Sequence, residues 1–295
     1  MTQNLPDGTF LAIAGSASTG LEYVAKVDLG GVVGTIYQFP ADQSAGFNVL
    51  YASDGNYYGT YQVNEGPAVL YRLTPTGATT TLLSLPVGNV LGRPLIQASD
   101  GNLYGSGITG NGEYAFVYQL TLSGGYTVLY TFPKGPTNMV DALLEGSDGN
   151  LYGAKGVYDV GNGALFSLTK TGQYTLLAGV GPAGVCNCWL TQGSDGMLYG
   201  AASLGIFAFD AGLPMPAPRA RQFTPASGPV GRKVLIWGAN LLSASVEFNG
   251  VPAVDASSSG ANYVWATVPA GATTGPITVT TPGGKSATSA NFTVP

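Results

Sequence analysis

One seven-residue motif recurs at nearly constant spacing in the first 200 residues of the chain. With small variations it is Ser-Asp-Gly-Asn-Leu-Tyr-Gly. The copies begin at Ser53, Ser99, Ser147 and Ser194, which are 46, 48 and 47 residues apart. A fainter copy at residues 6–11 places Asp7 47 residues before Asp54. Because self-similarity at a fixed period is the signature of a repeat architecture, we predict five repeats over residues 1 to about 210.

Each repeat contains four short segments with strand character. In the third repeat these are residues 94–99, 102–106, 115–121 and 126–132. The third segment alternates large apolar and other side chains with the period of two that is typical of a strand. Asp100-Gly101 lies between the first two segments, and Asp-Gly favours a two-residue hairpin turn with positive φ at its central positions. We therefore predict an antiparallel sheet of four strands in each repeat.

Four antiparallel strands in about 47 residues are typical of a propeller blade. The sequence thus predicts an all-β fold with a five-bladed β-propeller. The last blade is incomplete, because residues 206–210 match the third strand while a Pro-rich segment at 212–218 replaces the fourth. The first copy also matches the other repeats poorly at its start, residues 1–5. Three outcomes stay open: the chain ends complete a composite blade, the ring remains open, or another chain fills the gap.

The repeated core, followed by Phe-x-Leu-Thr, Gly and an aromatic-Thr-Leu-Leu segment, resembles the GloVer (Gloeobacter/Verrucomicrobia) tandem repeat of bacterial extracellular proteins. The resemblance covers about 70% of the chain. It implies a secreted or cell-surface protein with repeat-mediated interactions, and it carries no enzymatic residues. In blade count and period alone, the repeats are also similar to five-bladed tachylectin-type lectins, which implies sugar binding.

A second domain follows the Pro-rich stretch. The sequence predicts a propeller at 1–211, a semi-rigid linker at 212–221 and a separate domain at 222–295. Short, evenly spaced apolar segments in the last region predict an immunoglobulin-like β-sandwich, with a hairpin at Asn249-Gly250. Its opening Pro-x-x-Gly-x-x-Gly and its late Val-Thr-Thr-Pro-Gly-Gly resemble the IPT/TIG domain. That resemblance implies a spacer or an adhesive module.

Composition excludes several classes of function. The chain has no histidine, so Ser-His-Asp and Cys-His catalysis and His-ligated zinc are excluded. Its net charge of −5, with Lys and Arg scattered singly, offers no basic surface for nucleic acid. No apolar run is long enough to span a membrane. The first 20 residues lack the features of a signal peptide, and we expect a secreted or surface protein whose leader has been removed.

The two cysteines, Cys186 and Cys188, are too close for an unstrained disulfide and too few for a structural zinc site. Two small buried side chains at the start of a strand are the favoured interpretation. A strained redox-active disulfide and a transient metal contact are the alternatives.

The motif itself supplies the candidate binding residues, and each has two interpretations. The carboxylates and amides could bind calcium or sugar hydroxyls, or they could serve the turn alone, since a lone Asp-x-Asn supplies two of the six to eight oxygens that calcium requires. The tyrosines could stack on sugar rings or pack between blades. The candidate ligand-binding residues are Asn56, Asn102, Asn150, Tyr58, Tyr104, Tyr152 and Tyr199, and the weak metal candidates are Asp54, Asp100, Asp148 and Asp195.

These features predict recognition rather than catalysis. The first hypothesis is a multivalent glycan-binding propeller, with the C-terminal domain as spacer or anchor and no required cofactor. The alternatives are a protein-binding scaffold and a surface protein that self-assembles when the incomplete blade accepts a strand from a neighbouring chain. A polysaccharide-active enzyme is less favoured, because Glu22, Glu65, Glu113 and Glu145 do not share one repeat phase.

Overall fold

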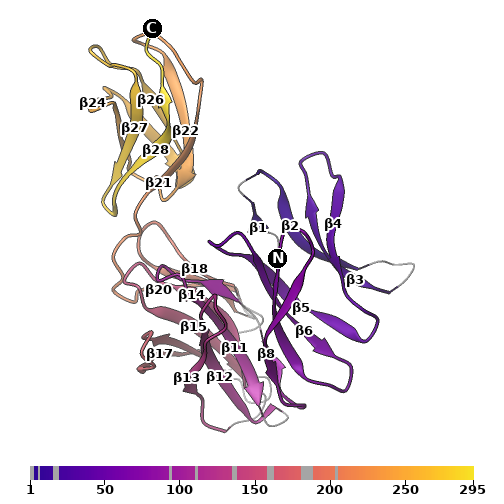
Figure 1. Ribbon diagram of the computed structural model, residues 1–295. Coiled ribbons are helices and arrows are strands. Elements are labelled where there is room, and N and C mark those ends of the chain that lie inside the picture. The colour runs from indigo at the N-terminus through magenta and orange to yellow at the C-terminus, as the bar shows by residue number, and fades with distance from the viewer. Residues whose placement is uncertain are drawn as a thin grey trace. The chain divides into compact units, whose positions relative to one another are not determined.

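The computed structural model describes residues 3–5, 7–15, 20–92, 95–109, 112–134, 138–157, 163–180, 189–202 and 205–295 (Figure 1). The secondary structure of these residues is all-β, without an α-helix, so none of them forms a helix able to cross a membrane. The chain divides into two compact units. The first comprises Met1–Leu190 and Gly200–Phe207, and the second comprises Thr191–Tyr199 and Ala208–Pro295.

Strands that follow one another in the sequence form small antiparallel sheets. Sheet I contains β1 (Gln3–Asn4), β2 (Phe10–Gly15), β3 (Glu22–Val27) and β4 (Val33–Gln38). Sheet II contains β5 (Gln43–Tyr51), β6 (Tyr57–Val63), β7 (Ala68–Leu73) and β8 (Thr79–Leu85). Sheet III contains β9 (Val90–Leu91), β10 (Ile96–Gln97), β11 (Leu103–Thr109), β12 (Tyr114–Leu120) and β13 (Tyr126–Thr131). Sheet IV contains β14 (Asn138–Glu145), β15 (Leu151–Val157), β16 (Gly163–Leu168) and β17 (Tyr174–Val180).

Sheet V has three strands in the described residues, namely β18 (Leu190–Gln192), β19 (Leu198–Ala202) and β20 (Gly205–Phe209). The Pro-rich residues that follow β20 add no strand to it, as the sequence predicted. The number of five blades and the closure of the ring stay predictions. Cys186 and Cys188 lie outside the described residues.

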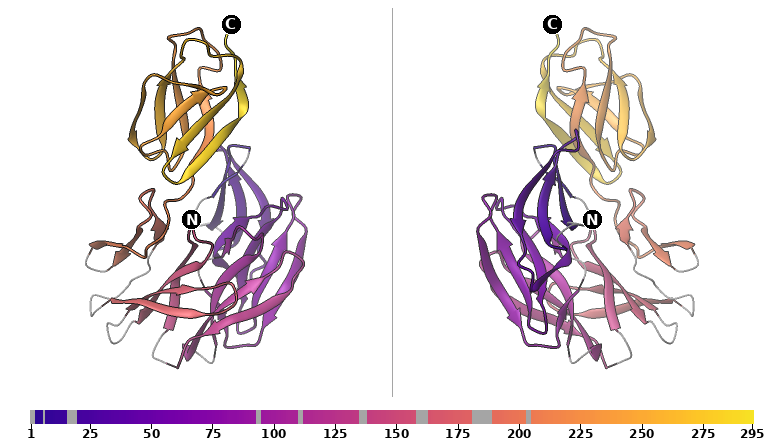
Figure 2. Two further views of the ribbon diagram at one scale, coloured as in Figure 1. Left: turned by 90° about the vertical axis from the view of Figure 1, so that its left-hand side faces the viewer. Right: turned by 90° about the vertical axis from the view of Figure 1, so that its right-hand side faces the viewer.

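Sheets I to IV lie beside one another in sequence order (Figure 2), since β2 contacts β5, β7 contacts β9, and β11 contacts β14. Each hydrophobic cluster of this unit is shared by two neighbouring sheets. Tyr57 packs toward sheet I and its neighbour Tyr58 toward sheet III, because successive side chains of a strand point to opposite faces. Burial of both faces gives the unit a propeller-like architecture.

The last glycine of the motif makes room for an aromatic ring on the next strand. Gly59 lies opposite Tyr71, Gly105 opposite Tyr118, and Gly153 opposite Phe166. A Cβ atom on any of these glycines would come within 3 Å of the facing ring, and Gly200 has the same relation to Phe207. The Tyr-Gly pair of the motif is thus explained by packing across the strands.

The Asp-Gly turns contain three residues and not the predicted two. In sheet III the N–H of Gly101 donates to the Ala98 carbonyl (2.9 Å), and the N–H of Ala98 donates to the Asn102 carbonyl (3.0 Å). Gly101 alone has positive φ in this turn, at +82°. The prediction of positive φ at both central positions is therefore wrong. With its own φ negative, Asp100 can accept the N–H of Asn102 through its side chain, and this favours a type I turn followed by a left-handed glycine.

A second turn, between the third and fourth strands, also recurs. In sheet II the hydroxyl of Thr74 accepts the N–H of Ala78 (3.0 Å), and Thr121 and Thr169 do the same in sheets III and IV. The glycines of two of these turns lie against the preceding sheet. A Cβ on Gly77 would touch the Ile36 carbonyl oxygen, and one on Gly172 would touch that of Leu129. Each of these turns therefore packs on the sheet before it.

The rest of the second unit, from Arg219 onward, is a sandwich of two four-stranded antiparallel sheets. One contains β21 (Arg219–Thr224), β22 (Lys233–Ala239), β26 (Tyr263–Thr267) and β25 (Ala256–Gly260), and the other contains β24 (Val251–Pro252), β23 (Ser245–Phe248), β27 (Gly275–Thr281) and β28 (Gly284–Phe292). The inward side chains of both sheets form one core. The predicted hairpin is confirmed, since β23 pairs with β24 and both Asn249 and Gly250 have positive φ.

The predicted linker is shorter in the structure. Strand β21 begins at Arg219, inside the predicted linker of residues 212–221, because Ala220 and Phe223 pack on the core of the sandwich. The Pro-rich residues before it are held by the same unit. Asn240 donates its side-chain N–H to the Ala217 carbonyl (3.0 Å), and Gln192 donates to that of Pro214 (3.1 Å).

Candidate functional site: the Asp-Gly turns

The Asp side chain organises each copy of the turn in the same way. In sheet II, Asp54 Oδ1 accepts the backbone N–H of Asn56 (3.1 Å), while Oδ2 accepts the Asn56 side-chain N–H (2.9 Å) and the Tyr58 hydroxyl (2.7 Å). The equivalent bonds recur around Asp100 and Asp148. Asp195 retains two of them, to Met197 N–H and the Tyr199 hydroxyl, because methionine replaces the asparagine. The motif therefore encodes one hydrogen-bonded unit.

These hydrogen bonds change the pKa of both partners. Burial raises the pKa of Asp54, but the hydrogen bonds from Asn56 and Tyr58 outweigh burial and lower it overall. Burial and the bond to a carboxylate raise the pKa of Tyr58, and the same causes raise the pKa of Tyr104 to about 12. At neutral pH Asp54 is therefore ionised and Tyr58 is neutral, which is the state in which the bond between them is strongest.

The structure places the four motif tyrosines in two environments. Tyr58 and Tyr104 are fully buried and Tyr152 is 5% exposed, so their ring faces contact protein. Tyr199 is half-buried. All four hydroxyls donate to the Asp of their own turn. Packing and turn formation thus account for the contacts of Tyr58, Tyr104 and Tyr152. The same turns contain the three candidate asparagines, which are half-buried, namely Asn56, Asn102 and Asn150.

The four aspartates do not come together. In the described part of the chain, no three carboxylate or thiol side chains lie close enough to hold a metal ion. Two of the lone pairs of each carboxylate of Asp54, Asp100 and Asp148 are occupied at Oδ2 by donors of its own turn. The geometry therefore favours the turn over the calcium interpretation of these residues.

A contact between neighbouring turns was missed in the sequence. Gln97 lies two residues before the Ser99 of its own motif, and its side chain reaches back to the preceding turn, where it accepts the Ser53 N–H (2.8 Å) and donates to the Ser53 hydroxyl (2.9 Å). Glu145 occupies the equivalent position in sheet IV and accepts the N–H (2.7 Å) and hydroxyl (2.6 Å) of Ser99. The signal is a Gln or Glu two residues before the motif, which also occurs at Gln192.

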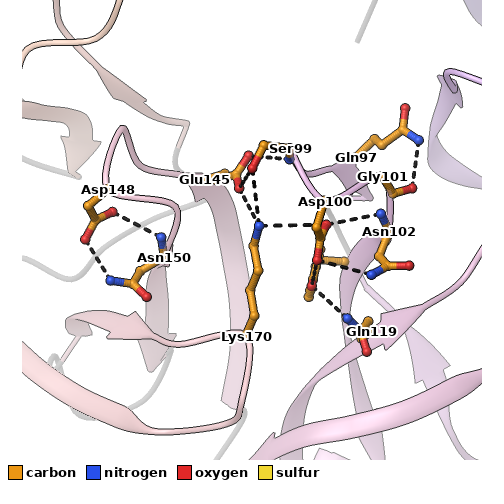
Figure 3. Close-up of polar contacts among 11 residues, drawn as sticks. Gln97, Ser99, Asp100, Gly101, Asn102, Gln119, Glu145, Asp148, Asn150 and Lys170 are labelled. Carbon is orange, nitrogen blue, oxygen red and sulfur yellow. Dashed lines mark hydrogen bonds and ion pairs between the residues drawn. The ribbon is translucent and has the colours of Figure 1, made fainter.

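The contact between sheets III and IV is charged, and Figure 3 shows Lys170 between Glu145 and Asp100. Lys170 Nζ lies 2.6 Å from Glu145 Oε1 and 3.7 Å from Asp100 Oδ1. It belongs to the second turn of sheet IV, where sheet III has Leu122. The boundary between sheets II and III has neutral residues at the two equivalent positions. Gln97 corresponds there to Glu145, and Leu122 corresponds to Lys170. Because the two boundaries differ in charge but share one geometry, we interpret the Lys170 cluster as a structural contact.

Asp54→Asn tests the hydrogen-bonded turn. At pH 7 the variant should lose about 1–2 kcal/mol of unfolding free energy, since an amide nitrogen cannot accept the two bonds made at Oδ2. The folded pKa of Asp54 is lowered, so its contribution is present above the unfolded pKa of about 3.9 and is lost as pH falls through the folded value. Wild type and variant should therefore converge in acid in urea titrations at pH 7, 4 and 2.5. Asp42→Asn, at an exposed carboxylate, is the control, and a difference for Asp54→Asn that does not change with pH would contradict the assignment.

Comparison with known families identifies the C-terminal domain. The family model of the IPT/TIG domain matches residues 218–294, the part of the chain that forms the sandwich. Residues 218–294 are an IPT/TIG domain. The match begins one residue before β21. No curated protein matches the sequence.

Similarity to solved structures concerns the fold. The periplasmic gluconolactonase of Pseudomonas aeruginosa has a TM-score of 0.51 and 13% identity, and the similarity covers 91% of this chain and 73% of that one. An exo-β-1,3-galactanase from Phanerochaete chrysosporium, solved with galactose, has a TM-score of 0.50 and 10% identity, with coverage of 99% and 89%. At these identities the comparison supports a propeller-like multi-sheet β fold and assigns no activity to the chain.

Proposed function

We propose that this chain is an extracellular bacterial recognition protein that binds a glycan through several similar sites on a five-bladed propeller of GloVer-type repeats. The IPT/TIG domain acts as its spacer or anchor. Domains of this family occur in extracellular proteins. In this chain the domain comes after the repeats and a short connecting segment, in which the Ala217 carbonyl accepts a hydrogen bond from the Asn240 side chain.

The observation that carries this proposal is the identical orientation of one amide in three sheets. Asn56, Asn102 and Asn150 each donate the side-chain N–H to the Asp of their turn, so the carbonyl oxygen of each amide is fixed relative to the turn. A fixed acceptor on a half-buried residue suits a sugar hydroxyl. Repetition of a weak site increases the overall affinity for a polymer that engages several copies at once.

A glycan-array screen of the full chain, with calcium and with a chelator, tests the proposal. We expect reproducible binding to a related set of sugars. The triple variant Asn56→Ala, Asn102→Ala and Asn150→Ala should lose most of the signal, while the matched variant Thr76→Ala, Ser123→Ala and Thr171→Ala, in the second turns, should keep it. Loss of binding in chelator would return the aspartates to consideration as calcium ligands. A blank array for a folded sample would contradict glycan recognition.

A second candidate function is self-assembly by strand addition. Sheet V has three strands in the described residues, and Ile206 on β20 is 85% exposed. A strand from a neighbouring chain would pair with such an edge. Light scattering over a range of concentrations separates the two functions, since a monomer at every concentration contradicts assembly. Turnover of a polysaccharide panel would instead indicate an enzyme.

A further inference from the structure

Two of the three tryptophans of the chain lie on the outer face of one IPT/TIG sheet. Trp237 on β22 is 41% exposed and Trp265 on β26 is 42% exposed. Their strands are hydrogen-bonded neighbours, and Figure 1 shows them in the C-terminal unit. The residues that alternate with the tryptophans, among them Ile236 and Val264, are fully buried in the sandwich core. Both rings must therefore point away from the core.

The pairing register brings the two rings close together. Trp265 lies directly opposite Leu235, and Trp237 lies directly opposite Tyr263, so the tryptophans are diagonal neighbours on one face. Diagonal neighbours in an antiparallel pair are about 7–8 Å apart, within reach of large aromatic side chains. The two tryptophans thus lie within reach of each other on the outer face of the sheet.

Neutral hydrogen-bonding side chains flank this surface. Gln222 on β21 lies opposite Trp237, and Ser257 on β25 lies opposite Trp265. Two rows of outward-facing residues run across the sheet. One row contains Thr224, Leu235, Trp265 and Ser257, and the other contains Gln222, Trp237 and Tyr263. None of these seven side chains is charged. The chemistry of the face is therefore aromatic at its centre, with amide and hydroxyl groups at its sides.

This chemistry complements a neutral sugar better than a protein surface. A pyranose ring presents C–H groups on its face, which suit the negative face of an indole ring, and hydroxyls at its edge. The exposed parts of two tryptophans amount to roughly 200 Å², since a whole aromatic side chain presents about 150–250 Å². A stable protein interface needs about 800 Å² from each partner. The small exposed area and the neutral residues on either side of the two rings thus argue for a small partner surface that is neutral where it meets them, while Lys233 lies one outward-facing residue pair further along, opposite Thr267.

We propose that this face of the IPT/TIG domain is a carbohydrate-binding platform, on which Trp237 and Trp265 stack against pyranose rings of one neutral polysaccharide chain. The site is separate from the Asp-Gly turns and does not rest on glycan binding by the repeats. It gives the C-terminal domain a binding role of its own, beyond that of a spacer or anchor.

Tryptophan fluorescence of the full chain tests the platform directly. Trp189→Phe leaves Trp237 and Trp265 as the only tryptophans. We expect a saturable change in emission on titration of this variant with at least one hexasaccharide of β-1,4-linked glucose, mannose or xylose, or of β-1,3-linked glucose. If none of the four probes changes the emission, the proposal is overturned.

Affinity electrophoresis in gels that contain the parent soluble polysaccharides then assigns the binding residues. Trp237→Ala and Trp265→Ala should each weaken retardation by about tenfold or more, because each removes about 100 Å² of apolar contact surface. The double variant should lose all binding due to this face. Trp189→Ala is the matched control, since it removes a tryptophan that is 60% exposed outside the sandwich, and it should bind as wild type.

Three outcomes separate this inference from other functions. Unchanged retardation of the double variant would overturn the platform and place binding elsewhere, such as at the Asp-Gly turns. Loss of binding only in the triple variant Asn56→Ala, Asn102→Ala and Asn150→Ala would also overturn the platform and place binding at the Asp-Gly turns. A dimer that dissociates in the double variant would show that the face is a protein interface, which also overturns the proposal. Urea midpoints should stay close to wild type, since neither tryptophan is one of the residues that form the sandwich core.

Discussion

Gly105→Ala should destabilise the chain by about 3 kcal/mol, at the upper end of the effects of overpacking a core. A Cβ atom at this position would lie within 3 Å of three atoms of the Tyr118 side chain, which is closer than real Cβ atoms come. Tyr118 cannot move aside, because it is buried between Phe116 and Tyr126 in the cluster that joins sheets II and III. Either the ring or β11 must shift, and both movements disturb the packing of two sheets.

Urea unfolding followed by circular dichroism measures this effect, and Gly179→Ala is the matched control. Gly179 lies in the outermost strand of sheet IV, has no positive φ, and has nothing within 4 Å of where a Cβ would stand. The alanine there should be neutral or stabilise by a few tenths of a kcal/mol, because it restricts the unfolded chain. If Gly105→Ala were as stable as Gly179→Ala, packing would not be the reason for the glycine of the motif.

Glu145→Ala should cost about 2–3 kcal/mol, the second largest effect that we expect. The variant leaves the Ser99 N–H and hydroxyl without their acceptor and removes the close partner of Lys170. A polar group left unsatisfied away from water costs about 1–3 kcal/mol, more when it is charged. Part of this penalty is relieved by solvent, because the Lys170 and Glu145 side chains are partly exposed.

The repeats supply a natural design for the rescue of this contact. Glu145→Gln with Lys170→Leu converts the boundary between sheets III and IV to the neutral type found between sheets II and III. We expect each single variant to lose about 1–2 kcal/mol and the double variant to be more stable than the sum predicts, with a coupling energy of about 1 kcal/mol or more. Simple additivity in urea titrations of the four proteins would contradict a direct interaction between Glu145 and Lys170.

The strands and hairpins of the repeats could be predicted from the sequence, because alternation and turn residues are local signals. The type of the Asp-Gly turn could not, since it depends on whether the carboxylate of Asp100 accepts the N–H of Asn102, which a dipeptide rule ignores. The C-terminal domain was predicted to begin at residue 222, whereas β21 begins at Arg219, and the reason is similar. Arg219 follows prolines and resembles a linker residue, but its neighbour Ala220 packs on a core formed far along the chain.

The candidate sites were predictable only in part. The repeated Asp, Asn and Tyr could be found as a motif, whereas the burial of Tyr58 and Tyr104 depends on the next sheet, which covers them. Gln97 and Glu145 stand in equivalent positions, but their partners are 44 and 46 residues away. Trp237 and Trp265 each lie at an outward position of a strand, and only the register of β22 with β26 shows that they are neighbours.

The turn contacts of Gln97, Glu145 and the second turns point backwards along the chain, from one repeat to the repeat before it. Gln97 and Glu145 reach a serine of the repeat before them, and the turns at Gly77 and Gly172 rest on the preceding sheet. During synthesis from the N-terminus, each new repeat therefore meets a partner that the ribosome has already released. Because these contacts share one direction along the chain, further repeats can be added to the array. A duplicated unit of about 47 residues carries both the reaching side chain and the serine that receives the next one, so a gene can gain a repeat without a new interface having to evolve.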